Sequence, residues 1–161
     1  MRIVVLSDTH RDFFTALEIV KRHLHNADVF IHLGDGLKEW DDLRMLYPDK
    51  RMLAVRGNCD FAADEPAVAV LGCEDGHKVY YTHGHLHNVK YTPDEVMRAA
   101  RENGCDIVVH GHTHTACQYY EDGLYLLCPG SPSCPKDSKP GYGIIDITPA
   151  GVVLNNVVWS G

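Results

Sequence analysis

The sequence has no closely spaced pair of cysteines, no long apolar run and no excess of basic residues. Its 6 cysteines are scattered without a C-x-x-C motif, so we expect reduced, mostly buried thiols in a cytoplasmic protein. No apolar run approaches the ~18 residues of a membrane span, and the N-terminal run is too short for a signal peptide. The formal net charge of −7 argues against a nucleic acid or an anionic membrane as the main partner.

The composition is that of an ordinary globular domain. The chain has 161 residues, of which 45% are hydrophobic and 23% charged, so it can bury a substantial core. Repeats, linkers and low-complexity segments are absent from the sequence. We therefore expect one domain over residues 1–161.

The first half alternates between apolar runs and amphipathic stretches. Buried strands are predicted at 3–6, 29–33 and 52–55, with helical spacing of apolar residues over 12–27 and an amphipathic segment at 38–47. Successive βαβ units of this kind favour a parallel sheet.

The second half has a different pattern. Residues 67–72 and 77–82 predict an antiparallel hairpin around Cys73-Glu74-Asp75-Gly76, followed by a helix at 93–103 and a buried strand at 107–109. Two more hairpins are expected within 115–128 and 142–159, separated by an irregular loop at 128–141. Two packed sheets flanked by helices are the simplest α/β architecture for these elements.

Polar side chains follow five of the predicted strands. They are Asp8, His10, Asp35, Asn58, His83, His112 and His114. One such motif, whether Asp-x-His or His-x-His, fits a plain strand and turn equally well. Five in one chain point to a set of ligands, and the adjacent glycines let the backbone turn tightly beneath them.

These residue types favour particular ions. Carboxylate oxygen, amide oxygen and imidazole nitrogen suit Mn²⁺, Fe²⁺, Co²⁺, Ni²⁺ or Zn²⁺. Seven side chains are too many for one tetrahedral site and suit two ions that share a bridging carboxylate. The net negative charge of the chain would repel a phosphate substrate, and bound metal ions would overcome this repulsion in the site.

The ordered motifs resemble those of the calcineurin-like metallophosphoesterase superfamily, and within it the small single-domain prokaryotic phosphodiesterases. The resemblance runs through Asp8-x-His10, Gly34-Asp35, Gly57-Asn58, His83-Gly84 and Gly111-His112-Thr113-His114 to a short Pro129-Gly130-Ser131 stretch. It implies a four-layer α/β/β/α sandwich of two mixed sheets flanked by helices.

The resemblance also implies a metal centre and a reaction. One ion is expected on Asp8, His10, Asp35 and His114, and a second on Asp35, Asn58, His83 and His112, with Mn²⁺ as the first choice of metal. Hydroxide shared by the two ions would attack a phosphodiester, because coordination can lower the pKa of water to about 7. The expected partner is a small-molecule diester, and similar enzymes are commonly homo-oligomers.

One motif departs from many relatives. Where they have Gly-Asn-His followed by an acid, this chain has Gly57-Asn58-Cys59-Asp60. A thiol is a weak hydrogen-bond donor, so Cys59 would protonate a leaving oxygen poorly. We keep Asp35, Asn58, Cys59, Asp60 and the loop residue His85 as catalytic candidates, with His85 as a substrate contact or proton donor.

The remaining histidines have simpler interpretations. His32 and His110, in or next to buried strands, are expected to be hydrogen-bonded structural groups or supports for the ligands. His23 and His25 lie among charged neighbours and are expected on the surface of a helix.

Two alternatives stay open. The first is a binding module on the same fold, similar to the retromer subunit that has lost parts of its metal site. The second is a phosphomonoesterase, against which Cys59 counts. The complete set of seven ligand types favours the enzyme over the binding module.

Overall fold

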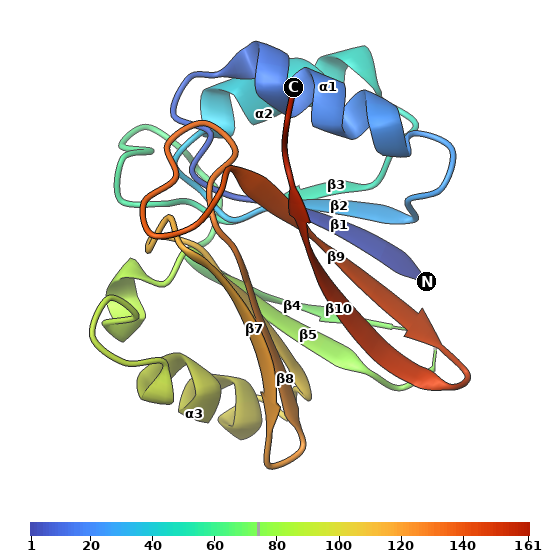
Figure 1. The fold of residues 1–161 in the computed structure, drawn as a ribbon, viewed down its shortest axis with the longest axis vertical. Helices are drawn as coiled ribbons and strands as arrows, with labels where there is room; N and C mark the ends of the chain where they lie inside the picture. The colour runs from blue at the N-terminus through green and yellow to red at the C-terminus, as the bar shows by residue number, and fades with distance from the viewer. Residues whose placement is uncertain (74) are drawn as a thin grey trace.

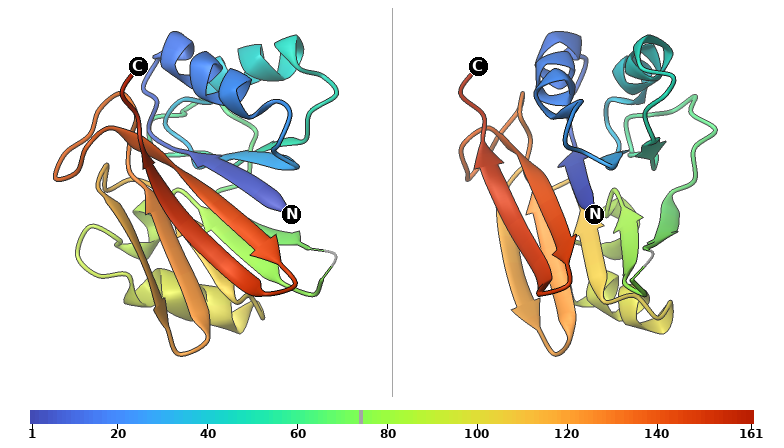
Figure 2. Two further views of the ribbon diagram at one scale, coloured as in Figure 1. Left: turned by 45° about the vertical axis from the view of Figure 1, so that its right-hand side comes forward. Right: turned by 90° about the vertical axis from the view of Figure 1, so that its right-hand side faces the viewer.

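The computed structural model describes residues 1–73 and 75–161, which form two five-stranded sheets packed face to face with helices on their outer sides (Figure 1). This is the predicted α/β/β/α sandwich. Figure 2 shows the layers from two further sides. Glu74, in the predicted turn of the first hairpin, lies outside the described residues.

The first sheet has the strand order β10-β9-β1-β2-β3. Its parallel part is β1 (Arg2–Leu6), β2 (Val29–His32) and β3 (Met52–Ala54), as the βαβ pattern predicts. The C-terminal hairpin, β9 (Gly141–Thr148) and β10 (Gly151–Val158), adds two antiparallel strands on the other side of β1. The sheet is therefore mixed, and its central strand is the first of the chain.

The second sheet has the order β4-β5-β6-β8-β7. The first predicted hairpin forms β4 (Val68–Gly72) and β5 (Lys78–Thr82), and β6 (Ile107–His110) runs parallel to β5. The next hairpin forms β7 (Ala116–Glu121) and β8 (Leu124–Pro129), of which β8 pairs with β6.

Helices cover the outer face of each sheet. The first sheet carries α1 (Phe13–His23) and α2 (Leu37–Leu46), whereas α3 (Asp94–Glu102) packs on the second sheet (Figure 1). Helix α1 begins where Asp12 accepts a hydrogen bond from the Thr15 amide at 3.0 Å. A short 3₁₀ helix, η1 (His85–His87), follows β5 and was not predicted. No helix of the described residues is long and apolar enough to cross a membrane.

The apolar core lies in three layers, because strands of both sheets are buried on both faces. The middle layer joins the sheets and includes Ile3, Val5, Ile31, Val109 and Leu127. Two outer layers join the first sheet to α1 and α2, and the second sheet to α3. Side chains alternate between layers along each strand, which fixes the register of the sheets.

Two expectations about individual side chains are wrong. His23 is buried rather than on the surface, since its ring packs against Tyr142 and its Nε2 lies 2.9 Å from the Tyr142 hydroxyl. The cysteines are not mostly buried: Cys59, Cys117 and Cys134 are exposed, and all the cysteines are free thiols. For His23 the neighbour that decides burial, Tyr142, is distant in sequence.

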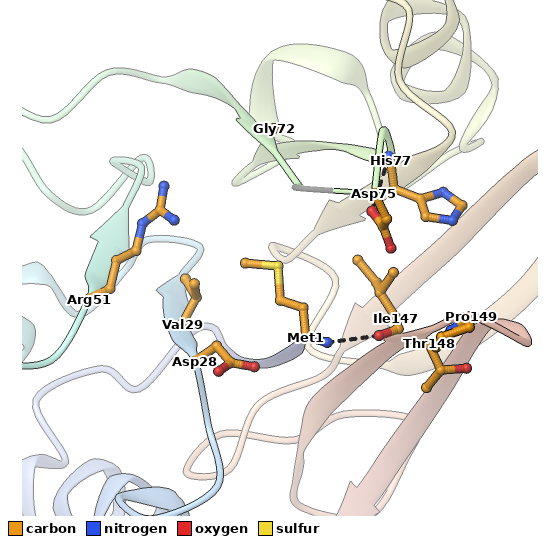
Figure 3. A pocket seen from close by; sticks show the side chains of 10 residues that line it. All are labelled: Met1, Asp28, Val29, Arg51, Gly72, Asp75, His77, Ile147, Thr148 and Pro149. Carbon is orange, nitrogen blue, oxygen red and sulfur yellow. Dashed lines mark hydrogen bonds between the residues drawn. The ribbon is translucent and has the colours of Figure 1, made fainter.

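A cavity of about 730 Å³ opens between the sheets at the amino-terminal ends of β1 and β2 (Figure 3). Met1, Val29, Arg51, His77 and Ile147 are among its lining residues. None of the predicted ligands lines it, because they follow the opposite, carboxyl ends of these strands. This cavity is therefore not the site at which the predicted ligands lie.

Candidate metal centre

The predicted ligands come together at the carboxyl ends of the central strands. Several hold their backbone in the left-handed region, with φ of 55° at Asp8, 43° at His10, 57° at Asp35, 68° at His112 and 58° at His114. This conformation costs an L-residue about 1–2 kcal/mol. Such strain gathered at one place is typical of a functional site.

Asp8 lies at the centre of this group and is fully buried. Its Oδ2 accepts hydrogen bonds from Ser7 Oγ at 2.6 Å and from the His112 amide at 3.0 Å. Its Oδ1 has no hydrogen-bond donor among the described residues. Burial raises the pKa of this carboxyl, whereas His114, His83 and Ser7 lower it. The lowering effects are larger together, and the pKa is about 2. A buried, ionised oxygen without a donor fits a cation.

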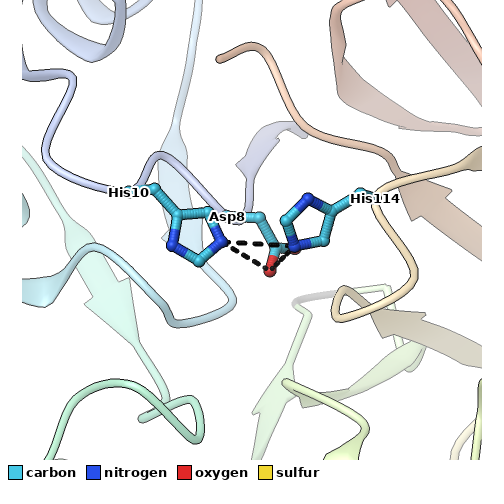
Figure 4. A group of neighbouring side chains, drawn as sticks. All are labelled: Asp8, His10 and His114. Carbon is cyan, nitrogen blue, oxygen red and sulfur yellow. Dashed lines mark hydrogen bonds and ion pairs between the residues drawn. The ribbon is translucent and has the colours of Figure 1, made fainter. Parts of the chain in front are cut away.

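Two imidazoles surround that oxygen, as Figure 4 shows. Asp8 Oδ1 lies 3.2 Å from His114 Nε2 and 3.8 Å from His10 Nε2, and the two nitrogens are 3.2 Å apart. A hydrogen bond with Asp8 raises the pKa of His114. His114 Nδ1 donates to the Cys134 carbonyl at 2.6 Å, so when the ring is neutral its Nε2 lone pair is directed into the site. These three side chains form one candidate ligand group.

A second group surrounds His83. Its Nδ1 donates to the Leu33 carbonyl at 2.8 Å, so Nε2 carries the lone pair. Nε2 lies 3.1 Å from Asn58 Oδ1 and 3.1 Å from His112 Nδ1. In the neutral His83 ring with the proton on Nδ1, both Nε2 and Asn58 Oδ1 are acceptors, and their approach to 3.1 Å fits a bound cation.

Asp35 connects the two groups. It forms candidate ligand groups with Asp8 and His83 and with His10 and Cys59. Asp35 Oδ2 lies 3.5 Å from His83 Nε2, while its Oδ1 accepts a hydrogen bond from the Cys59 amide at 2.8 Å. Its place between the groups is the one expected of a bridging carboxylate.

Asp60 binds backbone rather than facing these ligands. Its carboxylate accepts hydrogen bonds from the amides of Asp35 at 2.6 Å, Gly57 at 2.8 Å, and Gly36 and Leu37 at 3.1 Å each. Burial raises the pKa of Asp60, but these amides outweigh it and hold the pKa below its ordinary value. Asp60 therefore ties the loop after β2 to the loop after β3.

The other two catalytic candidates border the site. Cys59 is exposed, and its sulfur accepts a hydrogen bond from Asn58 Nδ2 at 3.3 Å. His85, on η1, has its ring centroid 5.4 Å from that of His83 and 6.2 Å from that of His112. Its buried Nδ1 has no hydrogen-bond partner among the described residues.

Supporting residues are the part that sequence reasoning missed. Ser131 is fully buried, donates from Oγ to the Asp8 carbonyl at 2.7 Å and accepts from the Cys134 amide at 2.8 Å. His32 acts as predicted: its Nδ1 accepts from the Gly34 amide at 3.1 Å, and Nε2 lies 3.0 Å from Thr9 Oγ1. The Pro-Gly-Ser stretch was the one available signal for Ser131.

Two glycines are required by close approach. A Cβ added at Gly57 would overlap Asp35 Oδ1, and one added at Gly111 would overlap Ser7 Oγ and lie 2.9 Å from Asp8 Oδ2. Each glycine therefore leaves room for a ligand carboxylate or its support.

Comparison with known proteins identifies the family. The sequence model of the calcineurin-like phosphoesterase superfamily domain matches residues 1–149. The chain belongs to this superfamily. As a calcineurin-like phosphoesterase, it is 35% identical over 149 residues to the probable metallophosphoesterase YsnB of Bacillus subtilis, covering 91% of this chain and 85% of YsnB. It is 32% identical over 116 residues to the phosphodiesterase YfcE of Escherichia coli, covering 66% of this chain and 58% of YfcE.

Solved structures of calcineurin-like phosphoesterases have the same fold. A predicted phosphoesterase from Streptococcus pneumoniae superposes with a TM-score of 0.79 at 25% identity, covering 97% of each chain. Vps29 of Entamoeba histolytica, solved in complex with Zn²⁺, superposes with a TM-score of 0.73 at 20% identity, covering 98% of each chain. Members of the superfamily use divalent metal ions, and this member has the candidate ligands to hold them.

Proposed function

We propose that this calcineurin-like phosphoesterase is a phosphodiesterase that depends on two divalent metal ions. The observation that carries the proposal is the fully buried Asp8, whose ionised Oδ1 has no donor among the described residues and lies amid histidine nitrogens. One ion would be held by Asp8, His10, Asp35 and His114. The other would be held by Asp35, Asn58, His83 and His112.

The donor set suits Mn²⁺ first, with Ni²⁺, Fe²⁺, Co²⁺ and Zn²⁺ as alternatives. When bound, the ions supply Lewis-acid stabilisation of the phosphate oxygens and activation of water for attack on phosphorus. The chain's own residues hold this centre rigid: Leu33 and Cys134 fix the tautomers of two histidines through their carbonyls. Asp60 fixes the loop that presents Asp35.

The charge near the site suits an anionic substrate better than the charge of the whole chain does. Burial and His83, with a smaller effect from Lys90, lower the pKa of His112 to about 4. Burial and His83 also lower the pKa of His85, and the charge of Arg56 lowers it by a smaller amount. Lys90 and Arg56 thus add positive potential at these histidines, Asp8 and Asp35 act against it, and bound metal ions would make the site favourable for a phosphate.

The residue at position 59 favours a diester whose leaving alcohol is acidic, such as an aryl ester, because such a leaving group needs little protonation. Burial raises the pKa of Cys59 to about 11, and Asp35 adds to the effect, so the group is a thiol at neutral pH. A thiol donates a hydrogen bond weakly. We assign contact with the leaving oxygen to His85, whose ring lies beside those of His83 and His112 at the edge of the site.

The experiment compares hydrolysis of bis-p-nitrophenyl phosphate with that of p-nitrophenyl phosphate. Metal-stripped protein is assayed after addition of Mn²⁺, Ni²⁺ or Zn²⁺, with Asp35→Asn as the inactive control. We expect turnover that requires metal and favours the diester. Preference for the monoester would instead identify a phosphomonoesterase.

A protein that binds two ions per chain yet hydrolyses neither ester would overturn the proposal. It would favour a binding module, the alternative that the fold shared with Vps29 keeps open. Cys59→His tests the leaving-group argument separately. We expect it to increase the rate on diesters with alkyl leaving groups, and an unchanged rate would contradict the assignment.

A further inference from the structure

Two cysteines face each other on the hairpin that follows the loop carrying His112 and His114, which we call the metal-binding loop. Cys117 on β7 and Cys128 on β8 are register partners, and both are free thiols. The hairpin closes with Glu121 opposite Leu124 around a two-residue turn. Pairs alternate from that turn, so Cys117 and Cys128 occupy a hydrogen-bonded position, where Cα atoms lie about 5.5 Å apart. A disulfide needs a Cα separation of about 4.4–6.8 Å.

The two thiols differ in access. Cys128 is fully buried, whereas Cys117 is exposed on the edge strand. The hydrogen bond between the two thiols lowers the pKa of Cys128 against the effect of its burial, whereas the same hydrogen bond, with burial, raises the pKa of Cys117 far above its ordinary value. The pair thus combines one thiol that solvent reagents can reach with a second thiol directly beside it.

The buried thiol also contacts the metal-binding loop. Cys128 Sγ lies 3.3 Å from Thr113 Oγ1. Thr113 stands between the proposed ligands His112 and His114, and its hydroxyl donates to the Thr115 carbonyl at 3.2 Å. The position of Cys128 sulfur therefore bears on the backbone that presents both histidines.

We propose that Cys117 and Cys128 are a site of reversible oxidation, and that their disulfide weakens metal binding through Thr113. The oxidation itself requires only the pair, whereas its effect on metal rests on the metal centre proposed above. Forming the bond draws Cys128 Sγ toward β7 and away from the threonine hydroxyl. Loss of a contact that orients metal ligands typically weakens metal affinity about tenfold or more.

The oxidant is a small-molecule disulfide of the glutathione class. The exposed Cys117 thiol gives up its proton to a solvent base, and its sulfur attacks one sulfur atom of the reagent, which forms a mixed disulfide and releases one thiolate. The Cys128 thiolate then attacks Cys117 Sγ, and the second thiol leaves. The protein loses two electrons and two protons, and the reagent is reduced to two thiols.

The test treats the metal-free protein with oxidised glutathione and reads the result by intact mass and peptide mapping without reductant. We expect loss of two hydrogen atoms and a peptide linked through Cys117 and Cys128, both reversed by dithiothreitol. Cys117→Ser should abolish the link. Cys134→Ser, which removes another exposed cysteine beside the site, should leave it intact. A persistent glutathione adduct, or a link between other cysteines, would overturn the proposed pair.

Metal content separates the second half of the proposal from the first. Oxidised and reduced protein are dialysed against graded Mn²⁺ or Zn²⁺, and bound metal is measured by elemental analysis. We expect about tenfold weaker binding after oxidation and no change in oxidised Cys117→Ser. Equal affinity in a fully cross-linked protein would refute the link through Thr113, and this readout does not depend on catalytic activity.

Discussion

Asp60→Asn tests whether one carboxylate holds the two loops of the site together. The substitution keeps the size of the side chain but replaces one acceptor oxygen with an NH₂ group, which cannot accept from a backbone amide. Each oxygen of Asp60 accepts from two amides, Oδ2 from Asp35 and Gly57, and Oδ1 from Gly36 and Leu37. The variant therefore loses at least two hydrogen bonds to a charged group.

The magnitude follows from those contacts. A hydrogen bond to a charged group contributes about 1.5–3 kcal/mol to stability, so two lost bonds give about 3–6 kcal/mol. Asp60 is only partly buried, so water screens part of this effect and we expect about 3 kcal/mol. For a chain of this length, each kcal/mol lowers Tm by about 2–4 °C, which predicts a decrease of about 6–12 °C.

The assay is thermal unfolding of the metal-free protein at pH 7, followed by circular dichroism. Asp64→Asn is the matched control, because it makes the same chemical change at an exposed position four residues away. Because the pKa of Asp60 is lowered in the folded protein, its contribution is present at pH 7 and decreases as pH falls through that pKa. The difference between the variants should therefore shrink in acid. Equal Tm values for the two variants at pH 7 would refute the reasoning.

Three further predictions concern other parts of the molecule. Gly111→Ala should reduce metal content severalfold by elemental analysis, since its Cβ overlaps the serine that supports the buried carboxylate, whereas Gly72→Ala, with open space around it, should not. His23→Leu leaves a buried tyrosine hydroxyl without its partner and should cost about 2 kcal/mol in urea unfolding, while exposed His25→Leu should cost little. Burial lowers the pKa of His32 to about 4, so the unfolded chain binds the additional proton and stability falls as pH decreases from about 6.5 toward 4. Between pH 7 and pH 5 this loss should reach about 2 kcal/mol and be absent in His32→Gln; equal pH profiles would contradict it.

The sequence predicted the architecture because most of its signals are local. Apolar runs located the strands, and the polar residues that follow them lie close together in the structure, since parallel strands bring their carboxyl ends to one edge of a sheet. Asp8 and His83, for example, lie in one group of neighbouring side chains, although they follow strands of different sheets.

Features that depend on distant neighbours were not predicted. The burial of His23 is decided by Tyr142, which is 119 residues away. Ser131 reaches the Asp8 carbonyl across 123 residues. The left-handed backbone at five of the proposed ligands was not predicted either, because aspartate and histidine, although enriched in this conformation, adopt it at only a small fraction of their positions.

The position of β1 has a consequence for how the chain folds. This strand lies between β2 and β9, and its pairing partner for Arg2 is Asp146. Contacts of such long sequence separation form slowly, because a long loop must close before they are gained. During synthesis the first strand therefore leaves the ribosome with one edge unpaired, and that edge stays open until the last hairpin emerges. The residues of β1 therefore meet one of their two partner strands only after residue 141 has been made, and a nascent chain stalled before that residue would expose an unpaired apolar edge to aggregation.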